Sequence, residues 1–148
     1  MDGQAPGPAQ ESAWRRFLDE VTGLGYGLLI TELDENDAGL PANRARRDRM
    51  VADYARCYLD ITLTYRQLEY VLTWGLIDKD SWLRQRAPRA DGIPKRPLPF
   101  DSDYRPKPLY FAIAEALCTA PARSHRHGAL GPGSAPADHL QQRLHRAP

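Results

Sequence analysis

The chain has 148 residues, of which 42% are hydrophobic and 26% are charged, as expected for a single globular domain with a core. Lysine and arginine total 20 against 19 acidic residues, so the overall charge favours neither nucleic acid nor an anionic membrane as a partner. No apolar run approaches the ~20 residues that a membrane-spanning helix requires. Met1–Gln10 lacks the basic start and apolar stretch of a secretory signal, so the sequence does not indicate a compartment.

The first predicted elements are a helix and a short strand. Apolar residues recur at helical spacing from Trp14 to Leu24, where glycines end the helix, and a strand follows at once over Gly27–Leu33. A helix joined to a strand by a tight loop is typical of parallel sheets. Because side chains alternate along a strand, four residues are expected to share one face. They are Leu28, Ile30, Glu32 and Asp34.

The acidic pair at the end of this strand, Glu32 and Asp34, is the most informative feature of the chain. Two carboxylates are costly to desolvate, and a purely structural strand has no use for them. At the carboxyl end of a parallel strand, however, side chains open into the mouth of an α/β barrel, where catalytic residues lie. The pattern predicts part of a catalytic site, the alternative being a carboxylate in a salt bridge at a strand end.

Helix and strand alternate again in the next part of the chain. A long helix is predicted over Ala42–Leu63 and a second strand over Glu69–Trp74, on which Tyr70, Leu72 and Trp74 share one face. Arginines near the start of the long helix alternate with acidic residues, which indicates a solvated helix face. These arginines are Arg44, Arg46, Arg47 and Arg49, with Asp48 and Asp53 interleaved.

A long loop, rich in proline and basic residues, is predicted over Leu76–Asp103, and a last helix runs from Pro106 or Pro108 to Leu117. The predicted order is therefore α-β-α-β-α, with two strands. Two parallel strands cannot close a sheet, so the chain either forms a dimer or is a piece of a larger sheet. The second interpretation is favoured, and the fold class is α/β.

The composition changes abruptly after Cys118. Residues 119–148 contain few large apolar side chains, which predicts a disordered tail after a folded part of residues 1–118. All four histidines lie in this tail at irregular spacing, and a solvated tail is favoured over a metal site. No metal or cofactor is predicted. Cys57 and Cys118 are too few for a disulfide framework, and a bridge between them stays open.

Four segments resemble, in the same order, signature segments of glycoside hydrolase family 10, the endo-β-1,4-xylanases. Ile30-Thr-Glu-Leu-Asp34 resembles the nucleophile signature of that family. Leu72–Leu83 resembles the segment after the last barrel strand, Pro97–Asp101 the following loop and Tyr104–Pro108 the start of the final helix. The resemblance covers about Ser12–Leu117. It implies a partial (β/α)8 TIM barrel, with the two strands as the seventh and eighth.

The resemblance also implies roles for four residues. Glu32 is implied as the catalytic nucleophile of a retaining hydrolase whose polysaccharide substrate is xylan. Asp34 is implied to hold a histidine beside the nucleophile, although no histidine precedes Glu32 in this chain. Trp74 and Trp82 are implied as aromatic walls of the sugar site, the alternative for Trp74 being a core position. Glu35 occupies a position that is usually apolar in the family.

Three functions remain open from the sequence. In the leading one, the chain is the C-terminal part of a xylanase and is inactive alone, because the family's general acid, an Asn-Glu pair, is absent from the 148 residues. In the second, it is a non-catalytic carbohydrate-binding or scaffold fragment that uses Trp74 and Trp82. In the third, it is a truncated reading frame with no independent role. Family members are commonly secreted or periplasmic, and the sequence does not indicate an oligomeric state.

Overall fold

The computed structural model describes residues 8–123, which form an α/β unit with one parallel pair of strands. The predicted α-β-α-β-α order is confirmed, with two additional short helices before the last long one. In chain order the elements are α1 (Pro8–Gly23), β1 (Leu28–Leu33), α2 (Arg44–Thr62), β2 (Leu68–Thr73), the 3-10 helix η1 (Asp78–Asp80), α3 (Trp82–Arg86) and α4 (Pro108–Thr119).

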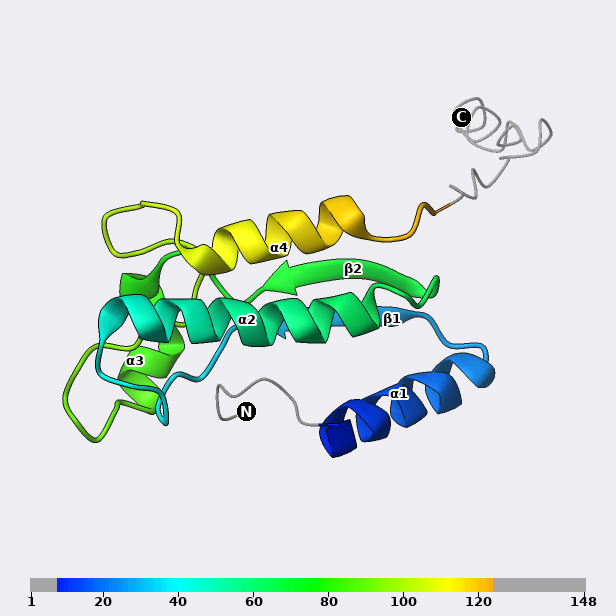
Figure 1. Cartoon of the computed structure of the whole chain (residues 1–148), viewed down its shortest axis with the longest axis horizontal. Coiled ribbons are helices and arrows are strands. Elements are labelled where there is room, and N and C mark those ends of the chain that lie inside the picture. Colours follow the sequence, from blue (N-terminus) through cyan, green and yellow to red (C-terminus); the bar gives the residue numbers. More distant parts are fainter. Residues whose placement is uncertain (1–7, 124–148) are drawn as a thin grey trace, which may run out of the picture.

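The two strands pack one face against α2 and α4, which lie side by side across the sheet (Figure 1). A core cluster fills the space between these helices and the strands. Its buried members are Ile30, Leu33, Leu59, Leu63, Leu68 and Ala116. Val71 of β2 packs against this cluster, as the central apolar residue of a half-buried strand should. Both strands run toward the end of the molecule that carries α3 and the connecting loops (Figure 1).

The opposite face of the sheet is open. Tyr70, Leu72 and Trp74 share this face as predicted, and they are 61%, 52% and 49% exposed. Leu29 of β1 is exposed as well, at 58%. An apolar sheet face of this kind is normally covered by further structure, because exposed contiguous apolar surface marks an interaction site. The open face therefore supports the interpretation that the chain is a piece of a larger sheet.

Helix α1 is only partly buried. Leu18 is 1% exposed, but Phe17 and Leu24, which the helical spacing predicts to be buried, are 50% and 72% exposed. Trp14 stacks on Phe17 with ring centroids 5.4 Å apart, and its indole nitrogen donates a hydrogen bond to Thr62 Oγ1 of α2 at 3.0 Å. One side of this helix thus binds to α2, and the rest of its apolar stripe faces solvent.

Helix α2 is capped by Asn43, whose side chain accepts a hydrogen bond from the backbone N–H of Arg46 at 3.0 Å. The prediction of a solvated basic face at its start is wrong for two residues, because Arg47 is 2% exposed and Asp48 is 7% exposed. Their charges are compensated by residues from loops that the local charge pattern does not reveal. Arg44, Arg46 and Arg49 are exposed as predicted.

The segment between β2 and α4 is more ordered than the predicted loop. It contains η1 and α3, and Phe100 forms isolated backbone bridges with Ile77 and with Pro106. Trp82 is therefore the first residue of a helix and not a loop residue. Helix α3 is capped by Ser81, whose hydroxyl accepts a hydrogen bond from the N–H of Leu83 at 3.2 Å.

Charged side chains join this segment to α2 and to the loop after β1. We call them the buried ion network, and its members are Asp37, Arg47, Asp48, Asp78, Arg96 and Lys107. Lys107 Nζ lies 3.0 Å from Asp78 Oδ1, and Arg96 donates two hydrogen bonds of 2.7 Å to the carboxylate of Asp48. Asp37 accepts from the backbone N–H of Arg96 at 3.0 Å and lies 3.3 Å from Arg47. Charges this deeply buried are retained only when they are paired and hydrogen-bonded.

Helix α4 begins at Pro108, one of the two predicted starts, and extends to Thr119. The predicted boundary between residues 118 and 119 thus falls in its last turn, and most of the predicted tail, with its four histidines, lies outside the described residues. Cys57 and Cys118 are both exposed and free. Among residues 8–123, no helix is long and apolar enough to cross a membrane.

Candidate active site

The carboxyl end of β1 presents Glu32 to solvent. The pairing of the strands is irregular there: Ile30 pairs with Val71 and Leu33 with Thr73, so three steps along β1 match two along β2. An extra residue of this kind is a β-bulge, which re-aims the side chains that follow it. Ile30 and Leu33 are consequently buried, at 8% and 5% exposure, while Glu32 between them is exposed.

Because of this bulge, the prediction that four residues share one face of the strand is wrong. Leu28, Ile30, Glu32 and Asp34 do not share one side, since strict alternation breaks between Ile30 and Leu33. The strand then ends in a tight turn, in which the backbone N–H of Asp34 donates to the carbonyl of Glu32 at 3.0 Å. The prediction that both carboxylates close the strand holds, but they reach their positions through an irregular backbone.

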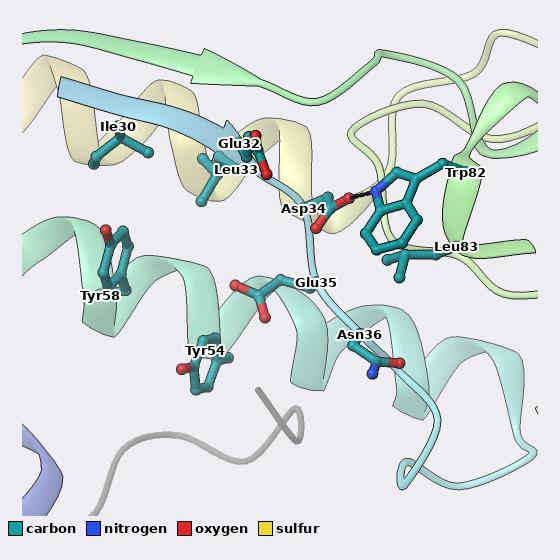
Figure 2. Close-up of a pocket in the computed structure, with 10 residues that line it drawn as sticks. All are labelled: Ile30, Glu32, Leu33, Asp34, Glu35, Asn36, Tyr54, Tyr58, Trp82 and Leu83. Carbon is teal, nitrogen blue, oxygen red and sulfur yellow. Dashed lines mark hydrogen bonds between the residues drawn. The ribbon is translucent and has the colours of Figure 1, made fainter. Parts of the chain in front are cut away.

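Asp34 contacts one of the two predicted aromatic residues. The indole nitrogen of Trp82 donates a hydrogen bond of 2.7 Å to Asp34 Oδ2 (Figure 2). Burial raises the pKa of the Asp34 carboxyl, the Trp82 hydrogen bond opposes that rise, and the neighbouring Glu32 adds to it. The Asp34 carboxylate therefore has Trp82 as a hydrogen-bond partner, and the charge of Lys95 also favours its ionised form.

A pocket of about 290 Å³ brings three of the four predicted site residues together at this strand end (Figure 2). Its lining contains Glu32, Asp34 and Trp82, but not Trp74. The remaining lining residues come from β1, the loop after it, α2 and α3. They are Ile30, Leu33, Glu35, Asn36, Tyr54, Tyr58 and Leu83. Trp74 lies instead just beyond β2, 49% exposed, on the open side of the sheet.

Glu35 is a pocket residue whose burial and raised pKa were not predicted from the sequence. It is 3% exposed and points toward Tyr54 and Tyr58 of α2 (Figure 2). Burial raises the pKa of its carboxyl to about 8, and the nearby Asp34 charge contributes to the rise. The signal available in the sequence was an acidic residue in a position where the family pattern is apolar. Its burial depends on α2, whose position the sequence does not give.

No group of three or more histidine, cysteine, aspartate or glutamate side chains in the described range is arranged to hold a metal ion. The charged residues that line the pocket are carboxylates with hydrogen-bonding and aromatic neighbours, and Lys95 contacts the pocket residue Asn36. Such an arrangement is suited to proton transfer, nucleophilic attack by a carboxylate, or binding of a hydroxyl-rich ligand.

Comparison with known proteins decides the family. The model of "Glycosyl hydrolase family 10" matches residues 3–116, which is more than half of the chain. The chain belongs to glycosyl hydrolase family 10. Among curated relatives of this family 10 chain, endo-1,4-beta-xylanase B from Thermotoga neapolitana is 30% identical over 110 residues, covering 71% of this chain and 29% of the relative. Exoglucanase XynX from Acetivibrio thermocellus is 30% identical over 102 residues, which is 66% of this chain and 8% of the relative.

Solved structures give the same assignment of the fold. Native xylanase 10B from Thermotoga maritima superimposes with a TM-score of 0.66 at 30% identity, covering 78% of this chain and 33% of that one. Xylanase 10B from Thermotoga petrophila, solved with xylobiose, gives the same values. The family 10 chain is thus part of a (β/α)8 barrel, as the resemblance implied. It spans about a third or less of the relatives that it matches, which explains the open face of its sheet.

Proposed function

We propose that this chain is the C-terminal part of a retaining endo-β-1,4-xylanase, with Glu32 as the nucleophile. The observation that supports this most is an exposed carboxylate at the carboxyl end of a barrel strand, in a pocket that it shares with Trp82. Catalytic residues of (β/α)8 barrels come from this end of the strands. Two family 10 relatives are described as endo-1,4-beta-xylanases, and one solved relative holds xylobiose, which makes xylan the proposed substrate.

In the proposed reaction, Glu32 attacks the anomeric carbon of a xylose unit while a second carboxylic acid protonates the leaving oxygen. A covalent glycosyl-enzyme forms, and water then hydrolyses it with the second carboxyl acting as base. Retaining enzymes place the two carboxyl groups roughly 5–5.5 Å apart. The net result is cleavage of a β-1,4 link with retention at the anomeric carbon.

The second carboxyl is not Glu35, although its raised pKa is the kind that suits a general acid. Its side chain points toward the tyrosines of α2, whereas Glu32 lies at the tip of β1, away from that helix (Figure 2). The 148 residues contain no Asn-Glu pair either. We therefore assign the acid to the rest of the barrel, and we expect the 148-residue chain alone to release no reducing sugar from xylan.

A chimaera tests the proposal. Residues 3–116 would replace the matching third of the Thermotoga maritima xylanase 10B, and hydrolysis of xylan would be measured. The chimaera should be active, and Glu32→Gln should lower kcat about 10³-fold or more, because removal of a nucleophile abolishes the covalent route. Glu69→Gln is the matched control. Glu69 lies near the amino end of β2, away from the carboxyl ends of the strands, so this substitution should leave kcat unchanged. A fully active Glu32→Gln chimaera would exclude the assigned nucleophile.

A second function is carbohydrate binding without chemistry. It is favoured by the exposure of Trp74 and Trp82, at 49% and 44%, since an exposed indole ring can stack on a sugar. Titration of the 148-residue chain with xylohexaose, followed by tryptophan fluorescence, tests it. Quenching shows that the chain binds the sugar, and unchanged fluorescence at millimolar sugar excludes this function.

A further inference from the structure

Trp82 combines an exposed ring with a fixed backbone. The side chain is 44% exposed, yet its two neighbours, Ser81 and Leu83, are 1% and 4% exposed. The hydroxyl of Ser81 also caps α3 directly before the tryptophan. With the backbone held on both sides, only the two side-chain torsions of Trp82 remain to be set.

One contact sets these torsions. The indole N–H donates to Asp34 Oδ2 at 2.7 Å, a bond between residues 48 positions apart that joins the end of β1 to the start of α3 (Figure 2). Hydrogen bonds to a carboxylate are shorter and stronger than those between neutral groups. A contact of this length fixes the plane of a large ring that solvent would otherwise leave free to move.

The acceptor is itself held in place. The backbone N–H of Asp34 donates to the carbonyl of Glu32 at 3.0 Å, and the next N–H, that of Glu35, donates to the carbonyl of Pro97 at 3.2 Å. The strand end is thus tied on one side to the bulge of β1 and on the other to the segment before α4. The hydrogen bond from Trp82 to Asp34 therefore holds the indole ring at a fixed position relative to the end of β1.

We propose that Asp34 is a positioning residue that holds the indole of Trp82 as a fixed wall of the Glu32 pocket. Because its N–H is engaged by Asp34, the ring offers an apolar face and no hydrogen-bond donor. The ligand chemistry that fits such a wall is the C–H face of a pyranose, and this part of the inference rests on the proposed function. Asp34 acts on a sugar through Trp82 and not by contact with the reacting atoms.

Indole N–H resonances of the 15N-labelled 148-residue chain test the hydrogen bond between Trp82 and Asp34 without any sugar. Three tryptophans give three signals, and Trp82→Phe identifies the one that belongs to Trp82. Trp14, whose indole N–H donates to Thr62 at the C-terminal end of α2, is the internal reference for the fold. In Asp34→Ala the Trp82 signal should shift and its hydrogen exchange should become about tenfold faster, while the Trp14 signal stays unchanged.

Asp34→Asn is the conservative variant, because the amide oxygen can still accept the indole N–H. It should keep the Trp82 signal near its parent position, with exchange between that of the parent and that of Asp34→Ala. Parent-like exchange of Trp82 in both variants would overturn the proposal. So would loss of the Trp14 signal in Asp34→Asn, since Asp34 would then support the fold as a whole.

A sugar titration separates this inference from the proposed function. Xylohexaose should bind the parent chain more tightly than Asp34→Ala by about fivefold to tenfold, with Asp34→Asn between them. If the exchange results are as expected and no variant binds the sugar, the positioning of Trp82 by Asp34 is supported and the carbohydrate part of the inference is rejected. If binding is equal in the parent and in Asp34→Ala, Asp34 does not position a sugar wall and that part of the inference is rejected.

Discussion

Two regions of this molecule differ in how far they bury their side chains. The open face of the sheet leaves Tyr70 and Leu72 more than half exposed, and Glu32 at the end of β1 is exposed as well. The buried ion network, in contrast, encloses its charges almost completely, and Asp78 is 1% exposed. The difference shows which contacts the chain makes by itself and which it leaves to other structure. The region that anchors the segment before α4 is enclosed by residues of this chain, and the side with the open sheet face and the Glu32 pocket is not.

The largest expected effect is in the buried ion network. Asp78 accepts hydrogen bonds from Lys107 Nζ at 3.0 Å and from the N–H of Leu98 at 3.1 Å. Burial raises the pKa of Asp78 and lowers that of Lys107, and their ion pair opposes both shifts. Asp78→Ala leaves the buried ammonium of Lys107 without its counter-charge and should cost about 3–5 kcal/mol of unfolding free energy. Urea denaturation measures the loss.

Asp80→Ala is the matched control, because this exposed residue ends the same short helix, η1. It should change the unfolding free energy by less than about 0.5 kcal/mol. Equal effects of the two substitutions would contradict the contrast between the buried ion network and the open side of the molecule.

Glu35 is a buried carboxyl of the Glu32 pocket, and its raised pKa predicts a pH dependence of stability. Its folded pKa of about 8 exceeds the ordinary 4.5, so the folded state binds this proton more tightly than the unfolded state. The stability that the proton confers is therefore complete below about pH 4.5 and is lost as the pH rises toward 8. The loss is at most about 1.4 kcal/mol per pH unit, with no further change above that range.

Glu35→Gln removes this titration. The difference in unfolding free energy between parent and variant should grow from pH 5 to pH 8 and then level off, as measured by urea denaturation at each pH. Glu20→Gln on the exposed side of α1 should reproduce the parent profile. A parent and Glu35→Gln with parallel profiles would show that the carboxyl is not held neutral by burial.

A leucine in the core and a leucine on the open face of the sheet give the next contrast. Leu59 of α2 is 0% exposed in the core cluster, whereas Leu72 of β2 is 52% exposed on the open face. Leu59→Ala should cost about 2–5 kcal/mol, because it leaves a cavity. Leu72→Ala should cost less than about 0.5 kcal/mol in the 148-residue chain. A large cost for Leu72→Ala would mean that the open face is covered in solution.

The smallest expected effect is at the start of α2, which connects the two regions. Asn43→Ala removes the hydrogen bond that its side chain accepts from the N–H of Arg46 at 3.0 Å. The loss should be about 1 kcal/mol, typical of a helix N-cap. Asn43→Asp keeps the acceptor and adds a charge that suits the positive end of the helix, so it should be at least as stable as the parent. Thermal unfolding compares the three chains. An alanine variant as stable as the parent would show that the side chain of Asn43 does not stabilise α2.

Local patterns carried much of the prediction. Helical and strand periodicity placed α2 and both strands to within a few residues, because one buried stripe dominates each element. The ordered motifs placed Glu32 and Asp34 at a strand end and indicated the family. The nucleophile role of Glu32 and the sugar-wall roles of Trp74 and Trp82 stay predictions. The structure groups Glu32, Asp34 and Trp82 in one pocket and leaves Trp74 outside it.

Other features depend on partners that are distant in the chain. The predicted strand alternation failed at Glu32 because a bulge is set by the register against β2. The predicted solvated face failed at Arg47 because Asp37, from the loop after β1, lies 3.3 Å away. The predicted loop after β2 failed because short helices form where caps and tertiary contacts support them, as Ser81 does for α3.

The sequence by itself determined the order of elements, the family and the position of the carboxylates, since each depends on residues close together in the chain. Only the tertiary structure decided the surroundings of those carboxylates. It turned Glu32 toward solvent through a bulge, gave Asp34 the indole of Trp82 as its partner, and buried Glu35 against α2. The physical reason is that exposure, pKa and hydrogen bonding are properties of the space around a side chain, and that space is built by segments far apart in sequence.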